Sequence, residues 1–176
     1  VIDALVQLTE TIDESLRVSA VKALGNLGRS DGRVIETLIR LARESYWRVR
    51  YSAAEALGKL GWKDGRVIDI LIQLAGDIDE RVRIVVAKAL GKSGQSGDRV
   101  IDVLIRFAGD IDDNIRSAAA EALGNLGRSD KKVIDALIRL ARDSYRDVRS
   151  SAIGALEKLL NFGAISDYRD VIEKNV

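Results

Sequence analysis

The sequence predicts an all-α fold, a right-handed α-α superhelix made of five two-helix repeats and closed by a final helix. Three observations support this prediction. An apolar segment recurs every 33 residues, beginning at Val1, Val34, Val67, Val100 and Val133. Each copy contains two stretches with apolar residues at helical spacing. Each of the first four copies then ends in glycines and a short polar turn. Repeats of this length bury their apolar faces against their neighbours and form a solenoid.

The boundaries of the repeats follow from this periodicity. We predict a single solenoid domain over residues 1–176. Its repeats span 1–33, 34–66, 67–99, 100–132 and 133–163, and a closing helix covers 164–176.

The second copy shows why each repeat should contain two helices. Its first stripe comprises Ile35, Leu38, Ile39, Leu41 and Ala42, with charged residues on the other face. Its second stripe comprises Val49, Ala53, Ala56, Leu57 and Leu60. The alanines allow neighbouring helices to approach closely, and short loops favour antiparallel pairs.

Pairs of glycines end the second helix of four copies, at 25/28, 58/61, 91/94 and 124/127. We expect the first glycine to loosen the last turn and the second to adopt the left-handed conformation that stops a helix. A phosphate-binding loop would instead place glycines before a helix. The spacing therefore indicates helix ends rather than a nucleotide site.

The two ends of the array differ. Ile165, Tyr168, Val171 and Ile172 recur at helical spacing, which predicts that the closing helix covers the last apolar face. The first repeat has no such cover. Its apolar face is either exposed, which would allow end-to-end self-association of the chain, or is covered by residues that precede Val1.

Composition limits the chemistry that the chain can perform. Lys and Arg number 28 against 27 Asp and Glu, so no overall field attracts nucleic acid. Cys and His are absent. We therefore expect no catalytic residues, no metal site, no cofactor and no enzyme activity. No apolar run reaches the length of a membrane span, and we expect a cytoplasmic protein without membrane contact.

One arginine occupies the same place in every copy. This ladder comprises Arg17, Arg50, Arg83, Arg116 and Arg149. In four copies an acidic residue precedes the arginine by six positions. Guanidinium groups bind carboxylates and carbonyls with several hydrogen bonds, so we expect the ladder to join adjacent repeats. The alternative is a basic strip for phosphates.

Segments 45–58 and 112–124 carry Arg-x-x-Ala-Ala-x-Ala-Leu-Gly after Val or Ile. This pattern resembles HEAT repeats, in the short form of phycobilisome-lyase-like proteins, although the turns lack the proline that many HEAT repeats carry. The resemblance implies that the second helices line a concave surface and that the arginines join repeats. The chain also resembles artificial HEAT-like proteins, because one nine-residue segment occurs at both 23–31 and 122–130.

The predicted binding surface lies on the second helices of the second and third copies. Aromatic and aliphatic residues stand there beside charged ones, and Trp, Tyr and Arg dominate binding hot spots. The predicted concave patch comprises Trp47, Arg48, Tyr51, Glu55, Lys59, Arg81, Ile84, Val85 and Lys88. The alternative is that Trp47 and Tyr51 pack against a neighbouring repeat.

We therefore expect a non-catalytic scaffold that binds a protein or peptide on this concave patch. Alternatives are a subunit of a bilin-lyase-like enzyme, as the resemblance implies, and a weak nucleic-acid-binding solenoid. Acidic residues interrupt the basic cluster, so nucleic acid is the less favoured partner. A designed repeat protein without a native ligand is a further alternative.

Overall fold

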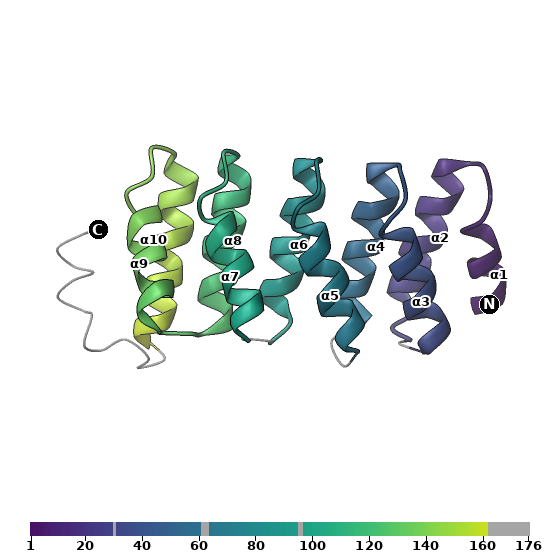
Figure 1. The fold of residues 1–176 in the computed structure, drawn as a ribbon, viewed down its shortest axis with the longest axis horizontal. Coiled ribbons are helices and arrows are strands. Elements are labelled where there is room, and N and C mark those ends of the chain that lie inside the picture. The colour runs from purple at the N-terminus through teal and green to yellow at the C-terminus, as the bar shows by residue number, and fades with distance from the viewer. Residues whose placement is uncertain (30, 61–63, 95–96, 162–176) are drawn as a thin grey trace. The chain divides into compact units, whose positions relative to one another are not determined.

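A computed structural model describes residues 1–29, 31–60, 64–94 and 97–161 of the chain. The predicted closing helix over 164–176 lies outside these residues. Within them the chain forms five successive pairs of helices (Figure 1). The helices are α1 (Ile2–Leu8), α2 (Glu14–Asn26), α3 (Gly32–Leu41), α4 (Trp47–Leu60), α5 (Gly65–Leu74), α6 (Glu80–Lys92), α7 (Asp98–Phe107), α8 (Asp113–Leu126), α9 (Lys131–Leu140) and α10 (Arg146–Asn161). The predicted all-α array of two-helix repeats is confirmed.

The chain divides into two compact units, Val1–Ala89 and Leu90–Val176, and the boundary falls within α6. The prediction of a single continuous domain stays a prediction. In the first unit the core includes Leu24, Leu57 and Leu71, which are fully buried. In the second unit Leu104 and Leu123 are buried equally. Each core therefore lies between the first and second helices, as the apolar stripes predict.

Aspartate side chains begin several helices. Asp13, Asp31 and Asp112 each accept a hydrogen bond from a backbone N–H three residues later, at 2.9–3.1 Å. These N-caps satisfy donors that the first turn of a helix leaves without a partner. These aspartates therefore fix where α2, α3 and α8 start.

The two glycines of each pair have different roles. Gly28, Gly94 and Gly127 have φ between 65° and 69°, so the prediction of a left-handed helix stop is confirmed at these positions. Gly25 and Gly124 instead lie buried inside α2 and α8. Each meets the next repeat at close range, and the expected loosening of the last turn stays a prediction.

The distances from a Cβ atom placed on each glycine show how closely the next repeat approaches. A Cβ atom on Gly25 would lie 2.8 Å from the Cβ of Ala56. A Cβ on Gly124 would lie 2.7 Å from the Cβ and 2.8 Å from the Cα of Ala155. Glycine on one second helix and alanine on the next therefore bring the two backbones together.

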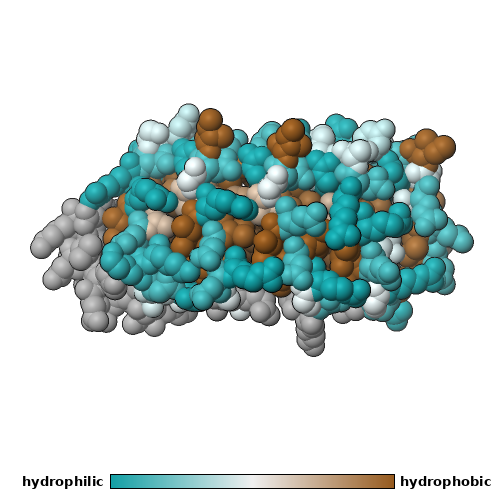
Figure 2. Space-filling view, viewed as in Figure 1, coloured by the Kyte–Doolittle hydropathy of each residue, from teal (hydrophilic) through white to brown (hydrophobic). Residues whose placement is uncertain are grey.

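Isoleucines in the loops between paired helices are almost fully exposed. Ile12, Ile78 and Ile111 expose 99%, 92% and 94% of their surface. Figure 2 shows hydrophobic residues between hydrophilic ones, and isolated hydrophobic side chains project at the edge. Among the described residues, no helix is long and apolar enough to cross a membrane.

Candidate functional site: the second-helix face of the first unit

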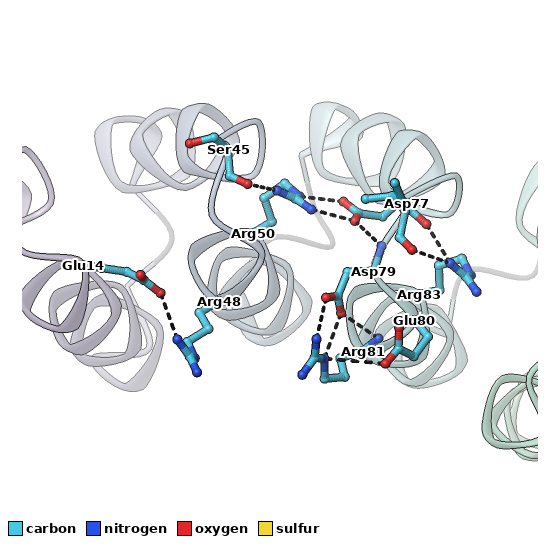
Figure 3. Close-up of polar contacts among 10 residues, drawn as sticks. Glu14, Ser45, Arg48, Arg50, Asp77, Asp79, Glu80, Arg81 and Arg83 are labelled. Carbon is cyan, nitrogen blue, oxygen red and sulfur yellow. Dashed lines mark hydrogen bonds and ion pairs between the residues drawn. The ribbon is translucent and has the colours of Figure 1, made fainter.

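The arginine ladder lies in the first turns of the second helices, and its side chains reach the loops between paired helices. Arg50 donates to both carboxylate oxygens of Asp77, at 2.6 and 2.8 Å, and Asp77 belongs to the next repeat. Its remaining terminal nitrogen donates to the carbonyls of Glu44 and Ser45, at 2.8 and 2.6 Å. Figure 3 shows this fork between the two repeats. The guanidinium of Arg50 thus binds the loop of its own repeat and the equivalent loop of the next repeat.

The ladder repeats in the second unit. Arg116 donates to both oxygens of Asp143 at 2.8 and 3.0 Å, and to the carbonyls of Asp110 and Ile111. This hydrogen bonding lowers the pKa of Asp143 and raises that of Arg116. Arg116 therefore donates to the backbone carbonyl of Asp110, six positions earlier, and to the side-chain carboxylate of Asp143, the equivalent residue of the next repeat.

The other members of the ladder also contact these loops. Arg17 approaches the carboxylate of Glu44 at 3.5 Å. Arg83 donates to the carbonyls of Asp77 and Ile78. Arg149 donates to the carbonyls of Asp143 and Ser144, 2.8 and 2.9 Å away. These contacts engage the guanidinium groups within the array and do not leave them as a strip for phosphates.

The predicted patch lies within the first unit, where its residues belong to α4 and α6. Figure 1 labels both helices. Trp47 is half-buried at the start of α4. The guanidinium of Arg81, from α6, lies 3.7 Å from the centre of its ring, and that of Arg48 lies 5.1 Å away. Tyr51 meets the ring edge-on, with centroids 6.4 Å apart. Part of the Trp47 surface is therefore engaged in contact between repeats, worth about 0.5–2 kcal/mol per cation–π pair.

Acidic side chains neutralise the two arginines beside Trp47. Arg48 lies 3.6 Å from Glu14 of the preceding repeat. Arg81 lies 2.7 Å from Asp79 and 3.8 Å from Glu80, as Figure 3 shows. The hydrogen bond from Arg81 lowers the pKa of Asp79. These arginines therefore carry little free positive charge toward a partner.

The other predicted residues differ in exposure. Ile84 is half-buried and Lys88 is exposed, whereas Val85 is only 6% exposed. The sequence placed Val85 on the open face, and this was wrong. Its position lies at the edge of the apolar stripe, where α6 packs against its neighbours. Glu55 and Lys59 form an ion pair at 3.4 Å, and Lys59 also donates to Asn26 at 3.2 Å.

Two rows of side chains cross the second helices of the first unit. We call Val18, Tyr51 and Ile84 the apolar row, because they occupy equivalent positions 33 residues apart and are all half-buried. We call Lys22, Glu55 and Lys88 the charged row. It lies one helical turn further along each helix.

Val18 and Lys22 were not part of the predicted patch, which was confined to the second and third copies. The signal that finds them is their alignment with Tyr51, Ile84 and Lys88 in the later copies. In the fourth and fifth copies the apolar row is replaced by Ser117 and Ser150. The apolar character is thus a property of the first three copies.

A concave region lies between α3 and α5 of the first unit. It has a volume of about 590 Å³, and Glu36, Arg40, Arg43, Arg66 and Asp69 are among its lining residues. Charges of both signs line it, so it does not select an anion or a cation. Within the described ranges, no group of three or more His, Cys, Asp or Glu residues could hold a metal ion.

Comparison with known families matches this chain to HEAT repeats over residues 2–91, 35–110 and 68–157. Comparison with curated protein sequences finds no match. Many solved structures have a similar fold. One is the complex of CpcE and CpcF of phycocyanin lyase from Nostoc sp. PCC7120, with a TM-score of 0.74 and 22% identity over 92% of this chain. The match spans only 65% of the length of that chain.

Designed repeat proteins are also similar. A designed armadillo repeat protein in complex with the peptide (KR)4 has a TM-score of 0.66 and 18% identity, covering 90% of this chain and 81% of that one. Armadillo proteins computationally designed for modular peptide recognition give a TM-score of 0.61 and 16% identity, with 99% and 96% covered. At these identities the likeness shows the fold.

Proposed function

The chain belongs to the HEAT-repeat family, and we propose that it is a non-catalytic scaffold that holds a protein or peptide segment on the second-helix face of its first three repeats. The observation that carries this proposal is the apolar row, Val18, Tyr51 and Ile84, which stays half-exposed between charged side chains. Partly exposed apolar surface of this kind marks interaction sites. The row would supply the buried centre of an interface and the charges its rim.

The proposal keeps part of the predicted patch and changes its centre. Tyr51, Ile84, Glu55 and Lys88 remain in it. Trp47 becomes a support, because Arg81 covers part of its ring and thereby links α4 to α6. The similar structures that hold peptides or a partner protein support a scaffold role by analogy of fold.

The test is a selection of peptides from a displayed library on the immobilised chain. Each selected peptide is then titrated by fluorescence anisotropy against the double variant Tyr51→Ser/Ile84→Ser, which copies the serines of the later repeats. We expect the affinity to fall by about tenfold or more, because Tyr at the centre of an interface is a frequent hot spot. Circular dichroism checks that the fold is kept.

The matched control is Ser150→Ala, which changes the equivalent position of the fifth repeat and should leave the affinity unchanged. Equal binding by the wild type and the double variant would show that the peptides bind elsewhere. A library that yields no binder to the wild-type chain would also count against the scaffold.

We further propose that a second copy of the chain covers the open face of the first repeat. Leu16 is 48% exposed, whereas its equivalents in later repeats, such as Val49 and Val82, are fully buried. Leu8 is 43% exposed, and its equivalent Leu41 is fully buried. The first repeat therefore exposes apolar side chains at positions that later repeats bury. Exposed apolar surface of this kind favours association in water.

Sedimentation over a range of concentrations tests this association. We expect the wild-type chain to form larger species as the concentration rises, and the variant Leu8→Glu/Leu16→Glu to remain monomeric, because charged side chains oppose burial. A wild-type chain that stays monomeric at every concentration would overturn the proposal.

A further inference from the structure

The charged row alternates in sign across three neighbouring helices. Lys22 and Lys88 are exposed, and among the described residues neither makes a hydrogen bond or ion pair. Glu55 stands between them and pairs with Lys59 along the same helix. Exposed ion pairs of this kind are weak, so Glu55 can exchange Lys59 for another cation. The row therefore presents a positive, a negative and a positive group in order.

The apolar row runs beside the charged row. Val18 precedes Lys22 by four residues, and Tyr51 and Ile84 precede Glu55 and Lys88 by the same distance. Residues four apart lie on the same side of a helix. A segment that crosses the helices between these rows would meet apolar surface on one side and alternating charges on the other.

The spacing of the helices favours one backbone conformation for such a segment. Packed helices lie about 8–10 Å apart, and the Gly25–Ala56 contact keeps α2 and α4 close. A polyproline II segment has three residues per turn and rises about 9 Å per turn. The same side of the segment would thus face each successive helix. An α-helix rises about 5.4 Å per turn and does not match this spacing.

We infer that the segment held on this face is extended, with acidic, basic and acidic side chains three residues apart that pair with Lys22, Glu55 and Lys88. The inference rests on the proposed function and adds the chemistry of the partner. Apolar side chains between the charges would lie on Tyr51 and its neighbours. Complementary charges set the register in which a partner binds and exclude partners with the opposite pattern.

The experiment compares two labelled peptides by fluorescence anisotropy at low ionic strength. The matched peptide is Pro-Glu-Pro-Leu-Lys-Pro-Leu-Glu-Pro, in which proline favours the extended conformation. The reversed peptide is Pro-Lys-Pro-Leu-Glu-Pro-Leu-Lys-Pro. We expect the wild-type chain to bind the matched peptide about tenfold more tightly. The variant Lys22→Glu/Lys88→Glu should prefer the reversed peptide.

A control of equal net charge is Arg29→Glu/Arg146→Glu, which changes two exposed arginines outside both rows and should keep the wild-type preference. Equal affinity of the wild type for both peptides, or a preference that the lysine variant does not change, would overturn the inference. If both peptides bind equally and Tyr51→Ser/Ile84→Ser weakens both, the scaffold function stands and only the charge pattern is lost. If neither peptide binds, the inference falls, and the library selection decides the function separately.

Discussion

Replacing Arg50 with alanine is expected to lower the free energy of unfolding by about 3–5 kcal/mol, because it leaves the carboxylate of Asp77 without its main partner. The Asp77 side chain is 6% exposed and that of Arg50 is 12% exposed. The same change removes both hydrogen bonds to the loop carbonyls of Glu44 and Ser45. Urea unfolding followed by circular dichroism measures the loss.

Two further variants distinguish the effect of the two Arg50–Asp77 hydrogen bonds from the effect of a positive charge alone. Arg66 makes a similar fork with Asp64, but its side chain is 58% exposed, so Arg66→Ala should change stability little. Arg50→Lys keeps the charge without the planar fork and should fall between the wild type and Arg50→Ala. If Arg50→Ala costs no more than Arg66→Ala, the ladder does not hold the repeats together.

Replacing Gly124 with alanine is expected to destabilise the second unit by about 1–3 kcal/mol through overpacking. The added methyl would meet the Cα and Cβ of Ala155 at 2.8 and 2.7 Å, so the helices α8 and α10 would have to separate. Alanine in a helix normally gains about 0.5–1 kcal/mol over glycine, and this gain offsets only part of the strain. Thermal or urea unfolding shows whether the variant is less or more stable than the wild type.

The chain provides a matched control in Gly154, which lies inside α10 with no atom within 4 Å of a Cβ. Gly154→Ala should therefore stabilise by about 0.5–1 kcal/mol. The double variant Gly124→Ala/Ala155→Gly should recover part of the loss, since it returns space to the contact. Stabilisation by Gly124→Ala would contradict a tight contact.

The array of helices could be predicted because each repeat carries the information for its own two helices. The apolar stripes and the second glycine of each pair act over a few residues, and such local signals are visible in one sequence. The role of the first glycine was not visible. Gly25 and Gly124 lie inside helices, and only the approach of the next repeat explains them.

The predicted patch stays a prediction, and the contacts of its residues could be foreseen only in part. Trp47 was expected to be an open anchor, and the stacked guanidinium of Arg81 could not be foreseen because it comes from another repeat. Val85 was expected to be exposed because helical periodicity does not distinguish the edge of a stripe from its open side. Aligning the copies, rather than reading each alone, brings Val18 and Lys22 into the surface.

The contacts between small residues have a consequence for how the array can change over generations. In α8, Ala122 faces a glycine of the preceding repeat, and Gly124 faces an alanine of the following one. A single repeat therefore encodes both the glycine and the alanine of this contact, so a repeat can pack against a copy of itself. If one repeat were duplicated or deleted in the gene, the repeats that become neighbours would form the same glycine–alanine contact. The length of the array can thus evolve in one step, without matching mutations in the neighbours.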